Sequence, residues 1–481
     1  MTRFIVVLGT TSHSGKSTIV AALCRILRNR GLKVAPFKSQ NMSLNSWVTY
    51  DGKEMGIAQA VQAWAAGVEP EEVMNPILLK PKGDRTSQVI VFGVPVADMS
   101  AEEYYRGIEG MKSVVDRAIE ELSGEAEINL YDRDIANIYV ARKLAAPIIL
   151  VGDIERGGVF ASLYGTVALL PADIRPLVCG LVINKFRGDP AILEPGLAML
   201  EELTGVPVLG VMPYLDLALP SEDSVSLGDK GGGGFQGAKR EEAGGSEAVD
   251  IAVIRLARIS NFTDFEPLER EGNLRYVTPG QPLGRPDAVI IPGTKNTVAD
   301  LLELRRRGTD REILALRDEG VPVLGICGGY QILGREIVDQ GIEDGDSVVA
   351  GLGLLNSETR FDRYEKRTVQ AEKTVTGDGP ILGPIKGEKV SGYEIHMGVT
   401  TSQDPPAFGD DGGVGGDGLV IGTYLHGIFQ NRNFRDAFLD HLYRRKNLPR
   451  RSAPVGDGYD ELAKAAEIHL DMKRIWDMME I

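Results

Sequence analysis

The chain has 481 residues, a formal net charge of −15 at pH 7, and 43% hydrophobic and 25% charged residues. This length exceeds what one hydrophobic core usually serves, so we expect two or three domains of a soluble globular protein. The acidic charge argues against nucleic-acid or membrane-surface partners, because either would need a large basic face. The three cysteines are too few for a disulfide framework, and no apolar stretch approaches the roughly 20 residues of a membrane span, which favours a cytoplasmic location.

The first half of the chain alternates short apolar runs with segments of helical spacing. Runs rich in β-branched residues predict buried parallel strands. They are FIVVLG (4–9), LKVAPF (32–37), APIILVGD (146–153) and LVCGLVIN (177–184). Between the first two, apolar residues of the segment 17–31 recur at helical spacing and end at a glycine. The pattern predicts a doubly wound α/β domain over residues 1–227.

A second α/β series follows a stretch rich in glycine and charge, residues 228–249, which predicts a flexible linker. The predicted strands of this second domain (250–448) are DIAVIRL (250–256), DAVIIPG (287–293), VPVLGICGG (321–329) and LVIGTYLHG (419–427), with a helix over 298–307. The glycine-rich segment 404–418 predicts a surface loop. Residues 449–481 predict an amphipathic helical extension that packs on either domain.

A glycine-rich loop, GTTSHSGKS, lies where the first strand gives way to the first helix. Backbone N–H groups there can surround phosphate oxygens, while Lys16 reaches the β- and γ-phosphates of ATP and the Ser17 hydroxyl holds Mg²⁺. The predicted nucleotide-binding residues are Thr10, Ser12, Ser14, Gly15, Lys16, Ser17 and Thr18. The loop has five residues between its glycines, and this spacing resembles that of dethiobiotin synthetase, which implies a dethiobiotin-synthetase-like domain. A fortuitous surface loop is the alternative.

A cysteine lies on a predicted strand–turn–helix elbow in the segment GICGGYQ, at Cys327. A thiolate at such a turn is a candidate nucleophile, and His426, about 100 residues later, is its candidate base. Upstream, the segment PGTK around Gly293 follows a strand and can offer backbone N–H groups to an oxyanion. The alternative for Cys327 is a buried, inert thiol, and the alternative for His426 is a structural histidine.

These three segments, in this order, resemble the class I glutamine amidotransferase domain, which has a flavodoxin-like α/β fold. The resemblance implies that the cysteine attacks the side-chain amide of L-glutamine and the histidine shuttles the proton. The residues it assigns to the oxyanion and to glutamine are Gly293, Gly328 and Gln331. Most members carry a glutamate two residues after the histidine, but Ile428 stands there, so the full triad is absent. His396 either borders the glutamine pocket or is a core residue.

Further stretches, together with PGTKNT and GICGGYQ, resemble the cobyric acid synthase family over essentially the whole chain. They are APFKSQNMSLN (35–45), MNPILLKP (74–81), DIERGGVF (153–160) and SGYEIHMG (391–398). The resemblance implies that a small-molecule corrinoid, (adenosyl)cobyrinic acid a,c-diamide, is amidated at its b, d, e and g carboxylates through acyl phosphates, with ATP and glutamine consumed. This places the chain in cobalamin biosynthesis as a glutamine-dependent amide ligase. The sequence carries no signal for an oligomeric state.

The resemblance also implies further ligands in the first half. Glu54 is the second Mg²⁺ ligand, with a solvated glutamate as the alternative. Lys38, Gln40 and Asn41 follow a predicted strand end, where sheets of this kind bind ligands, and we assign them to phosphate and substrate. Asn184 belongs to a segment that resembles an adenine-reading one, and a simple strand-end turn is its alternative.

One departure from the family concerns the third magnesium ligand. Family members carry an apolar strand with an acidic end before the segment EINL (127–130), whereas this chain passes from a predicted helix directly into it. We therefore expect a missing strand, through a deletion of roughly ten residues. Either Glu125, Glu127 or Asp153 substitutes as the ligand, or the ligase half is impaired.

Three alternative functions remain open from the sequence. Cobyrinic acid a,c-diamide synthase has the same two modules and chemistry but uses different carboxylates, and the segments 37–45 and 153–160 argue against it. A non-catalytic, partition-type ATPase would not need the pair of Cys327 and His426. A glutaminase without ligase activity would follow from the missing strand.

Overall fold

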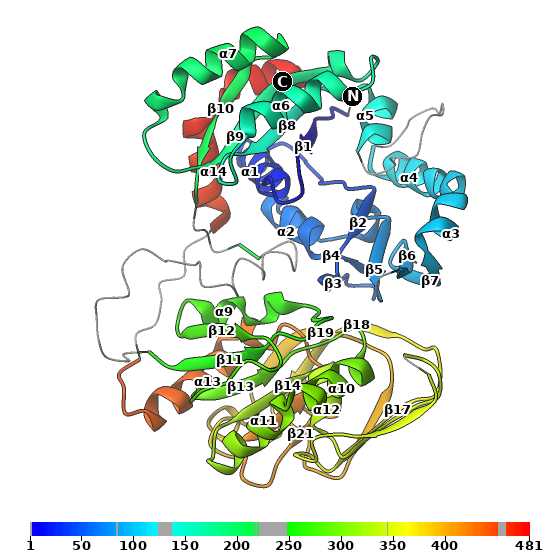
Figure 1. The fold of residues 1–481 in the computed structure, drawn as a ribbon, viewed down its shortest axis with the longest axis vertical. Coiled ribbons are helices and arrows are strands. Elements are labelled where there is room, and N and C mark those ends of the chain that lie inside the picture. The colour runs from blue at the N-terminus through cyan, green and yellow to red at the C-terminus, as the bar shows by residue number, and fades with distance from the viewer. Residues whose placement is uncertain are drawn as a thin grey trace.

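The computed structural model describes residues 2–82, 85–123, 137–215, 217, 219–220, 248–343, 345–450 and 458–481. These residues form two α/β halves, which lie one above the other in Figure 1. The chain up to residue 220 builds the first half, and residues 248–450 build the second. The C-terminal helices return to the first half, where they lie beside α1 and β10 (Figure 1).

A parallel sheet of four strands, in the order β1–β8–β9–β10, lies at the centre of the first half. Its strands are β1 (Val6–Gly9), β8 (Ile148–Asp153), β9 (Val178–Phe186) and β10 (Val208–Pro213). Alternate residues of β8 enter different cores: Ile149 packs in the cluster that contains α1, and Leu150 packs in the cluster that contains α6. Because both faces are covered by helices, the predicted doubly wound arrangement is confirmed.

The helices around this sheet match the apolar spacing of the sequence. They are α1 (Lys16–Asn29), α5 (Ile138–Leu144), α6 (Val159–Leu169) and α7 (Glu194–Thr204). The predicted strand over 32–37 is wrong, because these residues pair with no strand. Leu32 is exposed there, and Pro36 has no N–H group to donate to a ladder.

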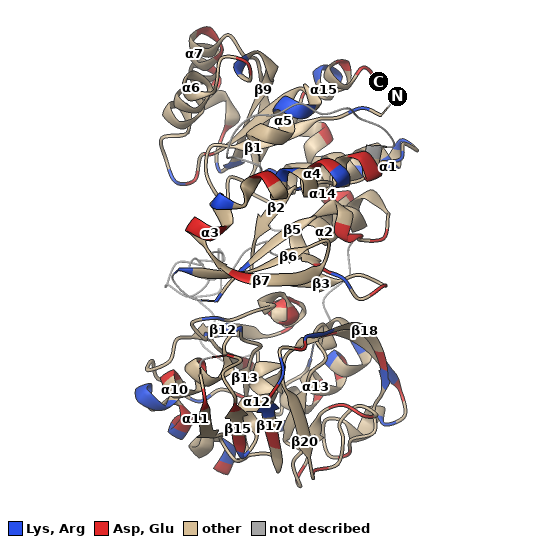
Figure 2. Ribbon diagram, turned by 90° about the vertical axis from the view of Figure 1, so that its right-hand side faces the viewer, with Lys and Arg blue, Asp and Glu red and all other residues tan. Residues whose placement is uncertain are grey.

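The first half contains a second sheet that the sequence analysis did not predict, in the order β2–β5–β6–β7, and a separate pair, β3–β4. The strands are β2 (Gln40–Met42), β3 (Ser46–Val48), β4 (Glu54–Gly56), β5 (Ile77–Pro81), β6 (Thr86–Val91) and β7 (Val94–Ser100). The accompanying helices are α2 (Ile57–Ala66), α3 (Ala101–Arg106) and α4 (Ile108–Ser123). Figure 2 shows β3, β6 and β7 between the parallel sheet and the second half, so this layer carries the contacts between the halves.

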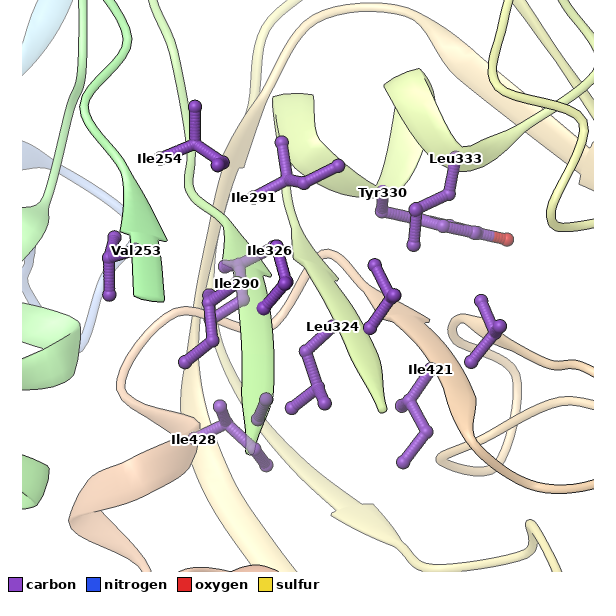
Figure 3. Close-up of a cluster of buried hydrophobic side chains, with 14 of the residues drawn as sticks. Val253, Ile254, Ile290, Ile291, Leu324, Ile326, Tyr330, Leu333, Ile421 and Ile428 are labelled. Carbon is purple, nitrogen blue, oxygen red and sulfur yellow. The ribbon is translucent and has the colours of Figure 1, made fainter. Parts of the chain in front are cut away.

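The second half is built on a six-stranded sheet in the order β12–β11–β13–β14–β22–β21, parallel except for its last pair. The strands are β11 (Asp250–Ile254), β12 (Asn273–Val277), β13 (Ala288–Ile291), β14 (Val323–Ile326), β21 (Gly413–Val414) and β22 (Val420–Thr423). Side chains such as Val253, Ile290 and Leu324 fill its core (Figure 3). Each such burial contributes roughly 1.5–3 kcal/mol to folding. The predicted flavodoxin-like α/β fold is confirmed.

Helices and small sheets surround the six-stranded sheet. The helices are α9 (Glu266–Glu269), α10 (Thr297–Arg307), α11 (Thr309–Asp318), α12 (Gly328–Leu333) and α13 (Arg432–Arg445). The further strands are β15 (Glu336–Asp339), β16 (Ser347–Ala350), β17 (Ser357–Phe361), β18 (Arg367–Thr374), β19 (Lys389–His396) and β20 (Val399–Ser402). The segment 404–418 is not the predicted surface loop throughout, since β21 lies in it and Phe408 packs fully buried against Phe434 of α13.

The C-terminal extension forms two helices, α14 (Gly458–His469) and α15 (Met472–Met479). They are separated because Leu470 bridges to Gly210 of β10 and the Asp471 side chain accepts a hydrogen bond from the N–H of Arg474. α14 packs on α1, where Arg25 contacts Asp460 at 2.7 Å. Of the two predicted packing sites, the extension therefore uses the first half.

Two predictions fall on parts of the chain outside the described residues. Residues 221–247 contain nearly all of the predicted linker. Residues 124–136 contain the predicted deletion, with Glu125 and Glu127. The predicted domain boundaries stay predictions. Among the described residues, no helix is both long and apolar enough to cross a bilayer.

Candidate active sites

The candidate nucleophile lies on a strained turn between β14 and α12. Cys327 has φ 52° and ψ −111°, a left-handed backbone that non-glycine residues rarely adopt, and its side chain is buried. The thiol Sγ lies 3.4 Å from the backbone oxygen of Ile395 in β19. Strain of this kind persists only where the surroundings enforce it and is common at active sites. The predicted strand–turn–helix elbow is therefore present.

Close backbone packing holds this turn in place. A Cβ atom on Gly329 would come within 1.9 Å of the backbone oxygen of Ile291, and one on Gly325 within 2.6 Å of the backbone of Gly329. The elbow therefore needs glycine at both positions, because neither backbone neighbour can move as a side chain does.

Replacing Gly329 with alanine should destabilise the protein by about 3 kcal/mol or more, because the new methyl group overlaps a backbone oxygen of the central sheet. Thermal unfolding followed by circular dichroism measures the effect. Gly416→Ala is the matched control, since nothing lies within 4 Å of a Cβ atom there. Equal unfolding temperatures for the two variants would contradict the packing of the elbow.

The candidate base follows β22 and is held by a carboxylate from far upstream. His426 Nδ1 lies 2.7 Å from Asp264 Oδ2, and the N–H of Gly427 donates to Asp264 Oδ1 at 2.9 Å. Burial alone lowers the pKa of His426, but the charge and hydrogen bond of Asp264, together with contact to Cys327, raise it to about 10. The carboxylate of Asp264 therefore favours the protonated ring, which lies beside the thiol of Cys327.

Asp264 places a carboxylate beside His426, where Ile428 has none to offer, so the structure contains the cysteine–histidine–carboxylate arrangement that the sequence analysis called absent. It lies in a 3₁₀ turn (Phe262–Phe265), 162 positions before His426 in the chain. The signal that could have found it is a carboxylate between two aromatic residues, since Phe262 and Phe265 are fully buried. A buried, unpaired carboxylate is costly, which points to a partner elsewhere in the fold.

Replacing Asp264 with asparagine should lower the glutaminase rate on the order of 10³-fold, because the imidazolium loses its counter-charge and orientation. Since Asp264 raises the pKa of His426, its loss should move the alkaline limb of the pH–rate profile from about 10 toward 6.5. Glutamate release measured across pH tests both effects. Asp287→Asn, a carboxylate that pairs with Lys446 elsewhere in this half, serves as the control. An unchanged profile would contradict the triad.

The other predicted residues of the glutaminase site lie around this pair. A Cβ atom on Gly293 would lie 3.0 Å from His426 Cε1, and one on Gly328 would lie 2.7 Å from Thr294 Cγ2. Gln331 donates to Met397 O and to the Tyr424 hydroxyl, both at 3.0 Å. The structure therefore brings Gly293, Gly328 and Gln331 together, and their roles toward the oxyanion and glutamine stay predictions.

A cavity of about 600 Å³, including its mouth, joins this site to the first half. Its lining contains Cys327 and His426 from the second half and Lys80 and Lys82 from β5 and its end. His396 also lines it and stacks on Tyr424 at 3.7 Å between ring centroids, so of its two predicted settings the structure supports the pocket border. The candidate nucleophile Cys327 therefore faces residues of the other half.

Glu54 lies in the contact between the halves and is fully buried, which rules out the solvated alternative. Its Oε1 is 2.6 Å from Lys80 Nζ, and its Oε2 contacts Lys366 Nζ of the second half. Burial alone would raise the pKa of Glu54, but the two ammonium groups hold it well below its usual range. Two cations therefore surround the carboxylate that the sequence analysis assigned to Mg²⁺, and that assignment stays a prediction.

The phosphate loop connects β1 to α1 as predicted. Lys16 Nζ donates to the backbone oxygen of Thr11 at 3.0 Å, across the loop. Asn184 Nδ2, from β9, donates to the backbone oxygen of Ser14 at 3.0 Å. The Ser14 hydroxyl is fully buried and has no partner among the described residues, a state that costs about 1–3 kcal/mol. A ligand oxygen would satisfy it, so the loop fits a phosphate.

The three predicted substrate residues lie at β2, in the second sheet of the first half. Lys38 Nζ donates to Asn41 Oδ1 at 2.9 Å, and the Gln40 side chain accepts from the Tyr104 hydroxyl at 2.6 Å. A Cβ atom on Gly56 would come within 2.4 Å of Asn41 Nδ2, so Asn41 lies against the strand that carries Glu54. Their assignment to phosphate and substrate stays a prediction.

Asp153, one candidate for the third magnesium ligand, ends β8. Its Oδ2 is 2.8 Å from Lys185 Nζ, and its Oδ1 accepts from the N–H of Glu155 at 2.9 Å. Among the described residues, no three His, Cys, Asp or Glu side chains converge as a ready metal site.

Comparison with known proteins identifies both halves. Residues 5–224 match the CobQ/CobB/MinD/ParA nucleotide binding domain, and residues 250–434 match the CobB/CobQ-like glutamine amidotransferase domain. The probable cobyric acid synthase of Methanococcoides burtonii is 60% identical over 492 residues, covering 99% of this chain and 97% of the relative. The chain belongs to the cobyric acid synthase family.

Other members of the cobyric acid synthase family match equally completely. The probable cobyric acid synthase of Methanosarcina mazei is 57% identical over 490 residues, covering 98% of each chain. That of Methanocella arvoryzae is 57% identical over 494 residues, covering 100% of this chain and 99% of the relative. The likeness therefore spans both halves and is not confined to one shared module.

Proposed function

We propose that this protein uses ATP and L-glutamine to amidate the b, d, e and g carboxylates of (adenosyl)cobyrinic acid a,c-diamide, giving cobyric acid in cobalamin biosynthesis. Membership of the cobyric acid synthase family supports this function. The observation that carries the proposal is the cavity in which Cys327, with its histidine and carboxylate, faces lysines of the nucleotide-binding half.

In the glutaminase half, the Cys327 thiolate attacks the side-chain carbonyl carbon of glutamine. The imidazolium of His426 gives its proton to the amide nitrogen, so that ammonia leaves and a thioester remains. Water, deprotonated by the now neutral His426, then hydrolyses the thioester to glutamate and the free thiol. Asp264 keeps His426 oriented through Nδ1 in both steps.

In the nucleotide-binding half, the phosphate loop aligns the γ-phosphoryl group of ATP with a corrinoid carboxylate. A carboxylate is a poor acyl donor, and phosphoryl transfer converts it to an acyl phosphate. Lys16 neutralises charge on the phosphoryl oxygens during this transfer. Ammonia then attacks the acyl carbon, inorganic phosphate leaves, and loss of a proton gives the amide.

Magnesium fits this half through oxygen ligands, which that ion prefers. The residues that would hold it are Ser17 at the start of α1 and Glu54, where the ion would have to displace the lysine ammonium groups that contact both carboxylate oxygens. Bound there, the ion would neutralise phosphate charge. The predicted nucleotide-binding roles of Thr10, Ser12, Ser14, Gly15, Thr18 and Asn184 belong to the same proposal, as does a cytoplasmic location.

The alternatives are less well supported. The close relatives that span the chain carry the name of cobyric acid synthase, not that of the a,c-diamide synthase. A partition-type ATPase has no use for a buried triad around Cys327. A glutaminase without ligase activity would not explain the phosphate loop and its buried Ser14 hydroxyl, which has no partner among the described residues.

Mass spectrometry of the corrinoid tests the ligase half alone. Cobyrinic acid a,c-diamide is incubated with the protein, Mg·ATP and ammonium chloride, so that glutamine is not needed. A series of equal mass losses that ends at the fourth amide is the expected result, because each hydroxyl is replaced by an amino group. An unchanged mass, with glutamate still released from glutamine, would reject amidation and leave the glutaminase alternative.

A further inference from the structure

The cavity beside Cys327 must hold more than an amide group. Glutamine is a zwitterion, and its α-ammonium lies roughly 5 Å from the carbon that the thiolate attacks. A buried ammonium needs an anionic or hydrogen-bonding partner, since burial of an unpaired charge is costly. The proposed glutaminase chemistry explains the amide end of the pocket but does not say what binds the α-ammonium.

The charges that line the cavity are strongly uneven. Four lysines face it: Lys80, Lys82, Lys295 and Lys366. Lys80 and Lys366 pair with Glu54, and Lys82 pairs with Asp98, but neither carboxylate belongs to the lining. Among the described lining residues, Glu343 carries the single carboxylate. An α-ammonium would be repelled by the lysine-rich side and attracted to Glu343, while the α-carboxylate would be attracted to the lysines. The lining therefore offers a carboxylate for the α-ammonium group of a free amino acid and lysines for its α-carboxylate.

Glu343 is connected to the nucleophile through a short chain of contacts. The N–H of Thr297 donates to Glu343 Oε2 at 2.7 Å, and the Thr297 hydroxyl donates to Gln331 Oε1 at 2.8 Å. A Cβ atom on Gly328, the residue after Cys327, would lie 3.3 Å from the Thr297 hydroxyl. Glu343 thus lies beside the helix start that borders the elbow, within the reach of a glutamine molecule held at Cys327.

The carboxylate of Glu343 is also available to bind a cation. No lysine or arginine of the described chain lies within ion-pair distance of it, in contrast to Glu54 with its two lysines. Burial raises the pKa of Glu343 to about 7, although the N–H groups of Thr297 and Val298 and the charge of Lys295 oppose the rise and Asp339 adds to it. A bound ammonium would supply the missing counter-charge.

We propose that Glu343 binds the α-ammonium group of glutamine and makes the glutaminase half selective for a free amino acid. This inference rests on the proposed glutaminase function and names a specificity residue for it. A purely structural role would be to accept the N–H groups at the start of α10, which the side-chain oxygen of a neutral glutamine can also do, though without the charge.

The test compares L-glutamine with 4-carbamoylbutanoate, which has the same amide but lacks the α-amino group. The unaltered protein should prefer glutamine on the order of 10²-fold or more in kcat/KM, since a site built for a polar group rejects the analogue that lacks it. Glu343→Gln should abolish most of this preference, mainly through a higher KM for glutamine. A preference kept in Glu343→Gln would overturn the proposal, and so would an equal loss with both substrates.

Binding gives a second readout that is independent of turnover. Calorimetry with Cys327→Ala should detect glutamine, and the double variant with Glu343→Gln should bind it at least tenfold more weakly. Equal affinity in the two proteins would overturn the role of Glu343. Ammonia-dependent amidation of the corrinoid reports the ligase half of the proposed function and should be unaffected by Glu343→Gln, so a failure of either claim is seen separately.

Discussion

Replacing Cys327 with alanine should abolish glutamine-dependent amidation and leave ammonia-dependent amidation largely intact. The sulfur of Cys327 is the protein atom that bonds to the acyl carbon in the proposed glutaminase step, and loss of such a nucleophile lowers turnover on the order of 10⁴-fold or more. The ligase half needs only ammonia, ATP and the corrinoid, so added ammonium should bypass the defect. Parallel assays with glutamine and with ammonium chloride measure the two rates on one preparation.

Cys24→Ala is the matched control for this experiment. Cys24 is buried in α1, and burial raises the pKa of its thiol to about 12, so it has no reactive thiolate near neutral pH. This variant should keep both activities. Loss of the ammonia-dependent reaction in Cys327→Ala would mean that the two sites are not separable. Full glutamine-dependent activity in this variant would show that Cys327 is not the nucleophile.

Replacing Lys16 with alanine should eliminate amidation with either nitrogen source, the reverse of the pattern for Cys327. Lys16 lies across the phosphate loop and is the cation proposed to neutralise the transferring phosphoryl group. Loss of such a charge costs on the order of 10³-fold in rate. Glutamate release in the absence of the corrinoid should persist, because the triad lies in the other half. Phosphate release and corrinoid mass are measured together.

An exposed lysine just after α1 provides the comparison for Lys16. Lys33→Ala removes the same charge from the same half at a solvated position and should leave the rate within about twofold. Amidation at the normal rate in Lys16→Ala would contradict the prediction that this loop binds ATP. Equal losses in both variants would show that overall charge, not the loop, is responsible.

The strands that were predicted correctly from the sequence were those with continuous apolar residues. Ala288–Ile291 and Val323–Ile326 are fully buried in the six-stranded sheet, so nothing polar interrupts their pattern. The second sheet of the first half was missed because β7 shows no apolar–polar alternation that follows burial: Val94 and Val96 are exposed, as is Asp98. The segment 32–37 has a strong apolar pattern but includes Pro36, which the prediction ignored.

The elbow and the phosphate loop were predictable because each is contiguous in the chain. Asp264 was not, because 162 residues separate it from His426 and only the folded sheet brings them together. The ion pair between Glu54 and Lys366 spans 312 positions and joins the two halves. Long-range polar contacts of this kind leave no periodicity in the sequence, and their partners emerge only from the three-dimensional arrangement.

The central claim is that one chain makes ammonia at Cys327 and uses it on a corrinoid. Incubation of cobyrinic acid a,c-diamide with the protein, Mg·ATP and glutamine labelled with ¹⁵N at its amide tests this claim most directly. The account predicts four new amides, each carrying the heavy nitrogen. A corrinoid of unchanged mass, or new amides without the label, would contradict it.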